Sequence, residues 1–460
     1  MSKVGNPKSS HAKAPGPVGR PFLGSLLEVR DDRLTFVVEL ARQFGDVARF
    51  RMGPKIMHLI NDPSHAKHVL QENSKNYNKG LGLEHAKPLL GEGLLTSEGD
   101  LWARQRHLVE PALRNPCLAR YAAVVREETM TMIEQWQHWC ETQRPVDVMV
   151  EVPRLTLRIL FLTLFGTDMQ TPSRAITESF NIAMEEASRR IVEPFTPPIW
   201  IPTRRNVAFK RALSALDEIV YGIIDARIEN ENESTSSQHD DVLSVLVRAM
   251  NDNRMNREQV RDEIVTILLA GHETTALTIV WSWYLMCRHP EIEEKLRSEI
   301  HESLGDRPPL FRDLTKLDYT RKVIKESLRL YPPVWLIPRT SVAADTIGGY
   351  YIPAGSAVLI SPYCMHRNKA FWDRPDSFDP EHFSDRAISR DRYAYLPFGA
   401  GPRHCLGSGF GLMEAQIVIV MVAQSFRLRL VPDTDGSPKP LLTLRPPSSL
   451  RFTIEASEHF

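Results

Sequence analysis

Phe398-Gly-Ala-Gly-Pro-Arg-His-Cys-Leu-Gly407 places one cysteine in a glycine-rich loop that leads into an apolar helix. Gly399 and Gly401 allow the backbone to turn tightly and to approach a flat ligand closely. The residues after Cys405 predict a long helix, and the unpaired N–H groups and dipole at its N-terminus favour a thiolate there. The simpler interpretation of an isolated cysteine is a buried thiol beside a flexible turn.

A thiolate with an arginine two residues away can bind a haem iron and pair with one haem propionate. The spacing Phe-x-x-Gly-x-Arg-x-Cys-x-Gly rarely arises by chance, because it fixes a rare cysteine among several other residue types. It resembles the haem-binding loop of the cytochromes P-450, the haem-thiolate monooxygenases. The resemblance implies that Cys405 is the axial ligand of haem b (iron protoporphyrin IX) and that Arg403 and Phe398 contact this cofactor.

Composition and length restrict the classes of function. The chain has 460 residues, of which 42% are hydrophobic, enough for a large core. Its 57 basic and 57 acidic side chains balance, so no nucleic-acid partner is expected. The five cysteines are irregularly spaced, as in a reducing cytoplasm where a free thiolate survives. The N-terminal residues show neither a signal-peptide core nor a membrane anchor, unlike microsomal members of the family, so we expect a cytoplasmic protein. The alternative is that a natural anchor has been removed.

Hydrophobic periodicity predicts a mainly helical fold with a smaller β lobe (α+β). The resemblance implies that the haem lies between a long central distal helix and the proximal cysteine loop and helix. Residues 1–30, rich in proline and glycine, are expected to form an irregular strap. Residues 31–460 are expected to form a single haem domain. Its β-rich lobe is predicted from about 45–65, 340–362 and 425–455, and its helical lobe from about 95–335 and 405–424.

A long helix is predicted from the capping box Asn256-Arg-Glu-Gln259 to His289-Pro290. It is apolar on nearly every side except at Ala270-Gly-His-Glu-Thr-Thr275. One interpretation of Thr274 is a side chain bonded back to a carbonyl one turn earlier. The segment also resembles the family's acid–alcohol motif, which implies that Thr274 hydrogen-bonds the bound oxygen and that Glu273 relays protons.

Further residues are placed around the haem by the resemblance. Glu326-Ser-Leu-Arg329 and Phe378-Asp-Pro-Glu-His-Phe383 resemble the family's structural triad, which would comprise Glu326, Arg329 and His382, with a titratable histidine in place of arginine. Another departure is Gly411, where the family pattern has alanine. The haem carboxylates require cations, and the residues implied for this role are Trp102, Arg106, Arg339 and Arg403.

The resemblance implies an enzyme that inserts one atom of O2 into a hydrophobic molecule, such as a fatty acid, terpenoid or polyketide. The residues that line the family's pocket are apolar here, a property that core residues share; they are Leu81, Leu83, Ile267, Ala270, Val334, Trp335, Ile337 and Leu442.

Electrons are expected from a separate ferredoxin or flavodoxin, because no flavin or iron–sulfur segment follows Cys405. Arg104, Arg114 and His404 are candidates for a basic docking face, although such charges often only solvate a surface. One alternative function is a non-enzymatic haem-thiolate sensor or electron carrier, which would have no use for the Glu273–Thr274 pair. Another is an isomerase or dehydratase that works without O2, and the sequence leaves that alternative open.

Overall fold

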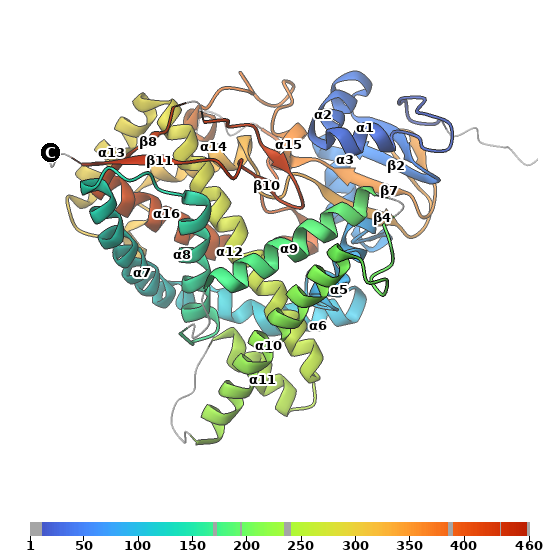
Figure 1. The fold of residues 1–460 in the computed structure, drawn as a ribbon. Coiled ribbons are helices and arrows are strands. Elements are labelled where there is room, and N and C mark those ends of the chain that lie inside the picture. The colour runs from blue at the N-terminus through green and yellow to red at the C-terminus, as the bar shows by residue number, and fades with distance from the viewer. Residues whose placement is uncertain are drawn as a thin grey trace, which may run out of the picture. The chain divides into compact units, whose positions relative to one another are not determined.

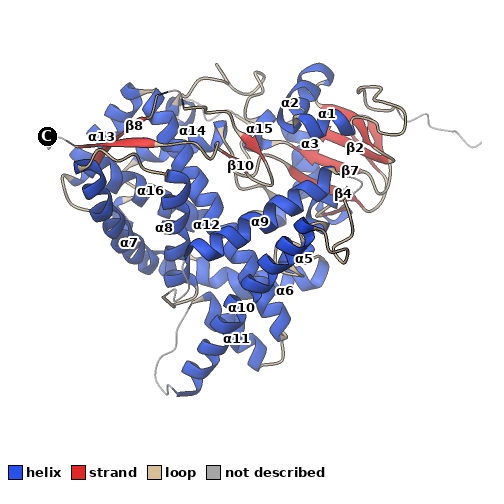
Figure 2. Cartoon of the chain, in the orientation of Figure 1, coloured by secondary structure: helices blue, strands red, loops and turns tan. Residues whose placement is uncertain are grey.

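A computed structural model describes residues 12–168, 173–193, 196–233, 241–384, 390–432 and 434–457. Helices predominate, with short strands between them (Figures 1 and 2). The chain divides into two units. Unit 1 comprises Met1–Leu81, Leu336–Phe371 and Asp391–His404, and unit 2 comprises Gly82–Trp335, Trp372–Arg390 and Cys405–Phe460. The predicted mainly helical fold with a smaller β part is confirmed.

Unit 1 is built on a five-stranded sheet of order β1-β2-β7-β4-β3. Its strands are β1 (Val47–Met52), β2 (Lys55–Ile60), β3 (Tyr77–Asn78), β4 (Ile337–Ser341) and β7 (Ala357–Ile360). β1 and β2 form the predicted hairpin, in which Met52 is opposite Lys55 and Gly53 takes the positive φ of +59° that a two-residue turn favours. β2 and β7 are parallel, so residues 300 positions apart along the chain share one sheet.

The other elements of unit 1 come before, between and after these strands along the chain. The N-terminal segment lies along β1, where the N–H of Arg49 donates to the carbonyl of Pro15 at 2.7 Å. The helices and the second hairpin are α1 (Leu26–Asp31), α2 (Arg33–Phe44), α3 (Pro63–Lys67), η1 (His68–Glu72), η2 (Ser74–Asn76), β5 (Asp345–Ile347), β6 (Tyr350–Ile352), α15 (Pro362–Met365), η7 (Arg392–Ala394) and η8 (Gly401–Arg403).

Unit 2 holds the long helices and two short two-stranded sheets, β8–β11 and β9–β10. Its helices are α5 (Lys87–Leu90), α6 (Gly99–Val109), η3 (Glu110–Leu113), α7 (Asn115–Glu141), α8 (Val148–Leu164), α9 (Ser173–Val192), α10 (Arg204–Glu233), α11 (Val242–Asn251), α12 (Arg257–Arg288), α13 (Pro290–Leu304), η4 (Phe311–Asp313), α14 (Asp318–Leu330), η5 (Pro380–Phe383) and α16 (Ser408–Ser425). Its strands are β8 (Phe426–Leu430), β9 (Lys439–Pro440), β10 (Leu444–Arg445) and β11 (Phe452–Ala456). A short helix, α4 (Leu81–Glu84), spans the boundary between the units.

α12 is the central helix of unit 2 and contacts α8, α14 and α16. The predicted capping box is present, because the N–H of Gln259 donates to Asn256 Oδ1 at 2.8 Å and the N–H of Asn256 donates to Gln259 Oε1 at 2.9 Å. The helix ends at Arg288, before Pro290, as predicted. By length and composition α12 and α16 could cross a membrane, yet 78% and 61% of their most apolar windows are buried, as in core helices.

The assignment of residues 425–455 to a β-rich lobe stays a prediction. The strands in this range, β8 to β11, belong to the unit that holds the long helices. The reason is local, because β8 follows α16 directly and packs against it and against α12. The division into a strap of residues 1–30 and a single domain stays a prediction, and residues 1–11 lie outside the described ones.

Candidate active site

The cysteine loop closes unit 1 and leads into unit 2. Gly399 and Gly401 have φ of +65° and +69°, values that favour glycine. A Cβ on Gly401 would lie 1.9 Å from the carbonyl oxygen of Leu70, so the close approach at this position is to the backbone of η1. Cys405 is exposed and lies three residues before Ser408, the first residue of α16. The thiol is therefore reachable at the entry to the apolar helix.

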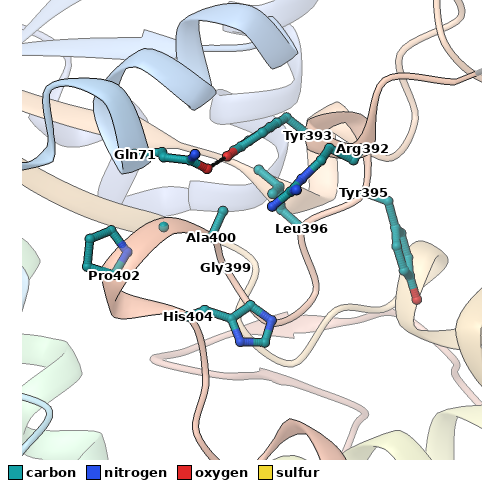
Figure 3. Close-up of a pocket in the computed structure, with 10 residues that line it drawn as sticks. Gln71, Arg392, Tyr393, Tyr395, Leu396, Gly399, Ala400, Pro402 and His404 are labelled. Carbon is teal, nitrogen blue, oxygen red and sulfur yellow. Dashed lines mark hydrogen bonds between the residues drawn. The ribbon is translucent and has the colours of Figure 1, made fainter. Parts of the chain in front are cut away.

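A cavity of about 540 Å³ lies beside this loop within unit 1 (Figure 3). Its walls include the side chains of Arg392 and His404, and Tyr393 at its edge donates a hydrogen bond to Gln71. A buried histidine fixes the backbone before the loop, because the N–H of Leu396 donates to His366 Nε2 at 2.8 Å. The ring of Phe398, partly buried, lies 6.4 Å from that of His404.

α16 approaches α12 closely at Gly411. A Cβ at this position would lie 3.2 Å from Thr275 Oγ1 of α12, tighter than ordinary contact. The glycine that departs from the family pattern thus gives room to a threonine of the facing helix. Gly271 has a similar role on the α8 side, where a Cβ would come within 2.3 Å of Leu160 Cδ1.

A strip in the middle of α12 is accessible although most of the helix is buried. Ala270 is exposed, and Ile267 and Thr274 are partly exposed. Their spacing of three and four residues puts them on one face of the helix. Thr274 Oγ1 donates to the carbonyl of Ala270 at 2.8 Å, which is the back-bonded geometry that the simpler interpretation predicted. The hydroxyl oxygen nevertheless belongs to the accessible strip and remains able to accept a hydrogen bond.

Glu273 is directed elsewhere. It is 6% exposed, and its Oε1 accepts a bond from Thr443 Oγ1 and an ion-pair bond from Arg445 Nε, both at 2.6 Å. Burial by itself raises the pKa of this carboxyl, but Arg445 and Thr443 outweigh burial and hold the pKa below its usual value. None of the described residues bonds to Oε2. The carboxylate is therefore ionised at neutral pH and does not contact Thr274.

Arg445 and Thr443 are functional candidates that the sequence analysis missed. Arg445 Nη1 also donates to Asn181 Oδ1 of α9 at 3.0 Å. A small cavity of about 70 Å³, enough for a few water molecules, lies at this junction. It is lined by Asn181, Met184, Glu185, Leu441, Leu442, Thr443 and Arg445. A buried acid in an apolar helix is a signal that a cation must be near, although it does not say which one.

The structure brings Glu326, Arg329 and His382 together within unit 2. Arg329 donates from Nε and Nη2 to the two carboxylate oxygens of Glu326, each at 2.7 Å, and neither side chain is exposed. His382 Nδ1 lies 3.0 Å from Glu326 Oε1, and its Nε2 lies 2.6 Å from the carbonyl oxygen of Asp373. Both ring nitrogens of His382 therefore lie within hydrogen-bond distance of an acceptor oxygen. Burial opposes the negative charge of Glu326, yet Arg329 and His382 lower its pKa.

Arg329 also ties the loop that precedes η5. It donates to the carbonyls of Pro375 at 2.5 Å and Ser377 at 2.8 Å, and its guanidinium lies 4.9 Å from the ring of Trp372. The N–H of Asp379 donates to Glu326 at 2.9 Å. Glu326 and Arg329 of the triad therefore fix the backbone at Pro375, Ser377 and Asp379, directly before η5.

The residues expected to hold the haem carboxylates are distributed over both units. Trp102 and Arg106 lie on α6, with the guanidinium 5.8 Å from the ring. Arg339 is 8% exposed on β4 and donates to the carbonyl of Pro338, and Arg403 ends η8. Their contact with a cofactor stays a prediction.

The predicted pocket residues are likewise in different environments. Val334 is exposed, Leu83 and Leu442 are partly exposed, and Trp335 is buried with its indole N–H donating to the carbonyl of Leu441 at 2.9 Å. Ile337 belongs to the hydrophobic core of unit 1. The side chain of Leu81 lies outside the described ones.

The residues of unit 2 fit the haem that the cysteine loop implies. Cysteine is among the residue types most often buried, yet Cys405 is exposed. α12, which packs against the helix that follows Cys405, presents a small apolar residue, Ala270, on its accessible strip. One thiol, an apolar wall and an arginine, Arg106 of α6, are donors that an iron porphyrin with carboxylates would use.

Comparison with known proteins agrees with this arrangement. The family model described as Cytochrome P450 matches residues 14–454. The chain is 38% identical to cyclooctatin synthase of Streptomyces melanosporofaciens, over 94% of this chain and 93% of that protein. It is 36% identical to cyclooctat-9-en-7-ol 5-monooxygenase of the same organism, over 92% and 90% of the two chains. It is 29% identical to pentalenene oxygenase of Streptomyces avermitilis, over 96% and 97%. The chain therefore belongs to the cytochrome P450 family and is a haem-thiolate monooxygenase.

Proposed function

We propose that this cytochrome P450 hydroxylates a cyclic, largely hydrocarbon molecule of the terpenoid class. The observation that carries the proposal is the accessible strip of α12, where apolar Ile267 and Ala270 lie beside Thr274. A substrate seated there contacts apolar surface beside a single hydroxyl. The names of two similar proteins refer to cyclooctat-9-en-7-ol, an unsaturated alcohol, and to pentalenene, an unsaturated hydrocarbon. Both names support a substrate with few polar groups.

Each site residue has a role in this proposal. Haem supplies the oxygen-activating chemistry when bound, and thiolate ligation favours cleavage of the O–O bond. Cys405 would hold this group through its thiolate. Arg106, Arg339 and Arg403 would pair with its carboxylates. The hydroxyl of Thr274 would hold a proton for the reaction. Ionised Glu273 takes protons from solvent through Oε2 while Oε1 stays fixed by Arg445.

The substrate class is tested by titrating the ferric protein with pentalenene and, separately, with a fatty acid of similar carbon number. We expect pentalenene to shift the haem spectrum from low spin to high spin at lower concentration than the fatty acid does. A stronger response to the fatty acid would contradict the proposed terpenoid class and favour fatty acids as the substrates.

The role of Thr274 is tested by Thr274→Ala. We expect haem content to be retained while the yield of product per electron falls by about tenfold or more, with the lost electrons recovered as hydrogen peroxide. Thr278→Ala is the matched control, because Thr278 also donates to a carbonyl of α12, that of Thr274, at 2.8 Å. Equal coupling in wild type and Thr274→Ala would remove the assigned role.

We further propose that a separate ferredoxin or flavodoxin with an acidic surface delivers the electrons in the cytoplasm. The cavity beside the cysteine loop supports this, because the basic side chain of Arg392 lies in its wall together with His404, which directly precedes Cys405 (Figure 3). Arg392→Glu is expected to slow reduction by an acidic ferredoxin and to weaken the salt dependence of its rate. Arg254→Glu, at an exposed arginine paired with Asp252, is the control. Equal slowing by both substitutions would argue against docking at this cavity.

A further inference from the structure

Two stacked aromatic rings lead from α12 towards the solvent within unit 2. The indole of Trp281, on α12 and fully buried, lies parallel to the phenol ring of Tyr331. Their ring centroids are 3.9 Å apart and their planes differ by 5°. Aromatic pairs usually pack offset or edge to face, with centroids about 4.5–7 Å apart. These two rings therefore overlap more closely than the packing of a core requires.

Trp281 belongs to the face of α12 that carries the accessible strip. It follows Thr274 by seven residues, or two helical turns, which places it about 10 Å further along the same face. Its indole N–H donates to the carbonyl of Leu444 at 3.0 Å, and this bond fixes the ring. The indole is therefore held near the strip to which the proposed function assigns the reaction with oxygen, an assignment on which the following proposal depends.

Tyr331 is the end of the pair that meets solvent. It directly follows Leu330, the last residue of α14, and is partly exposed. Tyr284 lies edge-on to both rings, 5.4 Å from Trp281 and 6.3 Å from Tyr331, but its hydroxyl accepts from Arg288 Nη1 at 3.2 Å. A cation next to a phenol disfavours the loss of an electron from it. Tyr331 is thus better placed than Tyr284 to be oxidised and to give its proton to water.

A second pair of aromatic residues shows what ordinary packing looks like on the same helix. Trp283 of α12 lies against Trp136 of α7, with centroids 5.8 Å apart and planes 59° apart, and both rings are buried. That pair has the tilted geometry common in cores and no exposed end. Only the pair of Trp281 and Tyr331 combines close overlap with access to solvent.

We propose that Trp281 and Tyr331 form a path by which oxidising equivalents leave the haem site when no substrate consumes them. Trp281 gives one electron to the oxidised site and takes one from Tyr331. Tyr331 releases its phenolic proton to water, and the neutral radical that remains takes a hydrogen atom from a small thiol. Two such passes join two thiols as a disulfide, and the unused oxygen atom leaves with two protons as water. The path protects the cofactor, which carries the oxidation chemistry, from its own oxidant.

The test uses the full-length ferric holoenzyme, treated with hydrogen peroxide without substrate, so that neither the proposed substrate class nor the proposed role of Thr274 affects the result. Electron paramagnetic resonance of rapidly frozen samples, with and without ring-deuterated tyrosine, is expected to show a tyrosyl radical in wild type. Tyr331→Phe removes a single hydroxyl and should shift the signal to a tryptophan radical. Its haem should bleach severalfold faster than that of wild type, and glutathione should no longer slow the bleaching.

Two substitutions of Trp281 separate electron transfer from packing. Trp281→Tyr keeps a ring that can be oxidised and should retain the tyrosyl radical and slow bleaching, whereas Trp281→Phe should lose both. Trp283→Phe, at the other buried tryptophan pair of α12, is the matched control and should behave as wild type. The ferrous carbonyl spectrum before peroxide is added reports that each haem site is intact.

Three results would overturn the proposal. The first is equal bleaching of wild type and Tyr331→Phe, and the second is an undiminished tyrosyl radical in Tyr331→Phe. The third is an effect of Trp283→Phe as large as that of Trp281→Phe, which would mean that loss of any buried indole from α12 exposes the haem to damage.

Discussion

Glu263 and Glu273 lie ten residues apart on α12, and both are buried, yet the structure gives them opposite charge states. Glu263 is fully buried, and its Oε2 accepts a single bond, from the N–H of Leu94 at 3.1 Å. Its Oε1 has no partner among the described residues. Burial raises its pKa to about 8. Glu273 has a guanidinium and a hydroxyl on one oxygen, and its pKa is lowered despite burial.

The difference teaches that burial does not by itself set the charge of an acid. What decides it is the segment that arrives from elsewhere in the chain. At Glu263 that segment is the loop before α6, which supplies one backbone donor and no cation, while neighbouring Asp262 adds negative charge. At Glu273 it is β10, which supplies Arg445. A neutral acid thus anchors a loop, and an ionised acid is paired with the arginine of β10.

The largest effect is expected from Arg445→Leu, which removes the cation beside Glu273 and leaves this buried acid without one, as Glu263 is. Removing one partner of a buried ion pair costs about 3–5 kcal/mol, so we expect a loss of that order in the free energy of unfolding at pH 7. The pKa of Glu273 should rise with it. Urea unfolding of the holoenzyme measures the first quantity. The double variant Arg445→Leu/Glu273→Gln should recover most of the loss, because no charge is then left buried.

Arg451→Leu is the matched control for this experiment. Arg451 pairs with Asp147 at 2.7 Å, but both side chains are about one-third exposed. Surface pairs contribute at most about 1 kcal/mol, so the control should lose little. Similar losses of unfolding free energy at both arginines, or no recovery in the double variant, would show that the Glu273–Arg445 pair contributes no more to stability than a surface pair.

The features of α12 that could be predicted from sequence are local ones. Asn256 and Gln259 are three residues apart and cap the same turn, and Pro290 limits the helix at the other end. The contact between Glu326 and Arg329 follows from their spacing on one helix. In each case the partners are fixed by helix geometry before any tertiary packing forms.

The partners of Glu273 could not be predicted because they are 170 and 172 residues away, beyond any periodic pattern. A buried acid implies that a cation lies near it. The sequence contains 57 basic side chains, however, and Arg445 belongs to no motif that would identify it as the partner. The direction of Thr274 is a further example. Adjacent helical residues point about 100° apart, so the acid and the alcohol of one motif face different neighbours.

The comparison is sharpened from the other side by Glu263→Gln. A carboxyl with a raised pKa keeps its proton in the folded state while the unfolded chain loses it above the model value of 4.5. Its contribution to stability therefore falls between pH 4.5 and about 8. Glutamine keeps the acceptor for Leu94 and does not titrate. Near pH 4 we expect Glu263→Gln and wild type to have the same thermal midpoint. At pH 8 the variant should have the higher midpoint, and its free energy of unfolding should exceed that of wild type by a few kcal/mol.

The smallest expected effect comes from Thr443→Val, which removes the hydroxyl donor to Glu273 but leaves Arg445 in place. A hydrogen bond to a charged group contributes about 1.5–3 kcal/mol, and we expect the lower end of that range because the ion pair remains. The lowered pKa of Glu273 means that its stabilising contribution is present above the unfolded value of 4.5 and is lost as the pH falls. The penalty should therefore be measurable in urea at pH 7 and should fade in acid. A penalty of equal size at both pH values would mean that Thr443 acts through packing, and the charge of Glu273 would then rest on Arg445 alone.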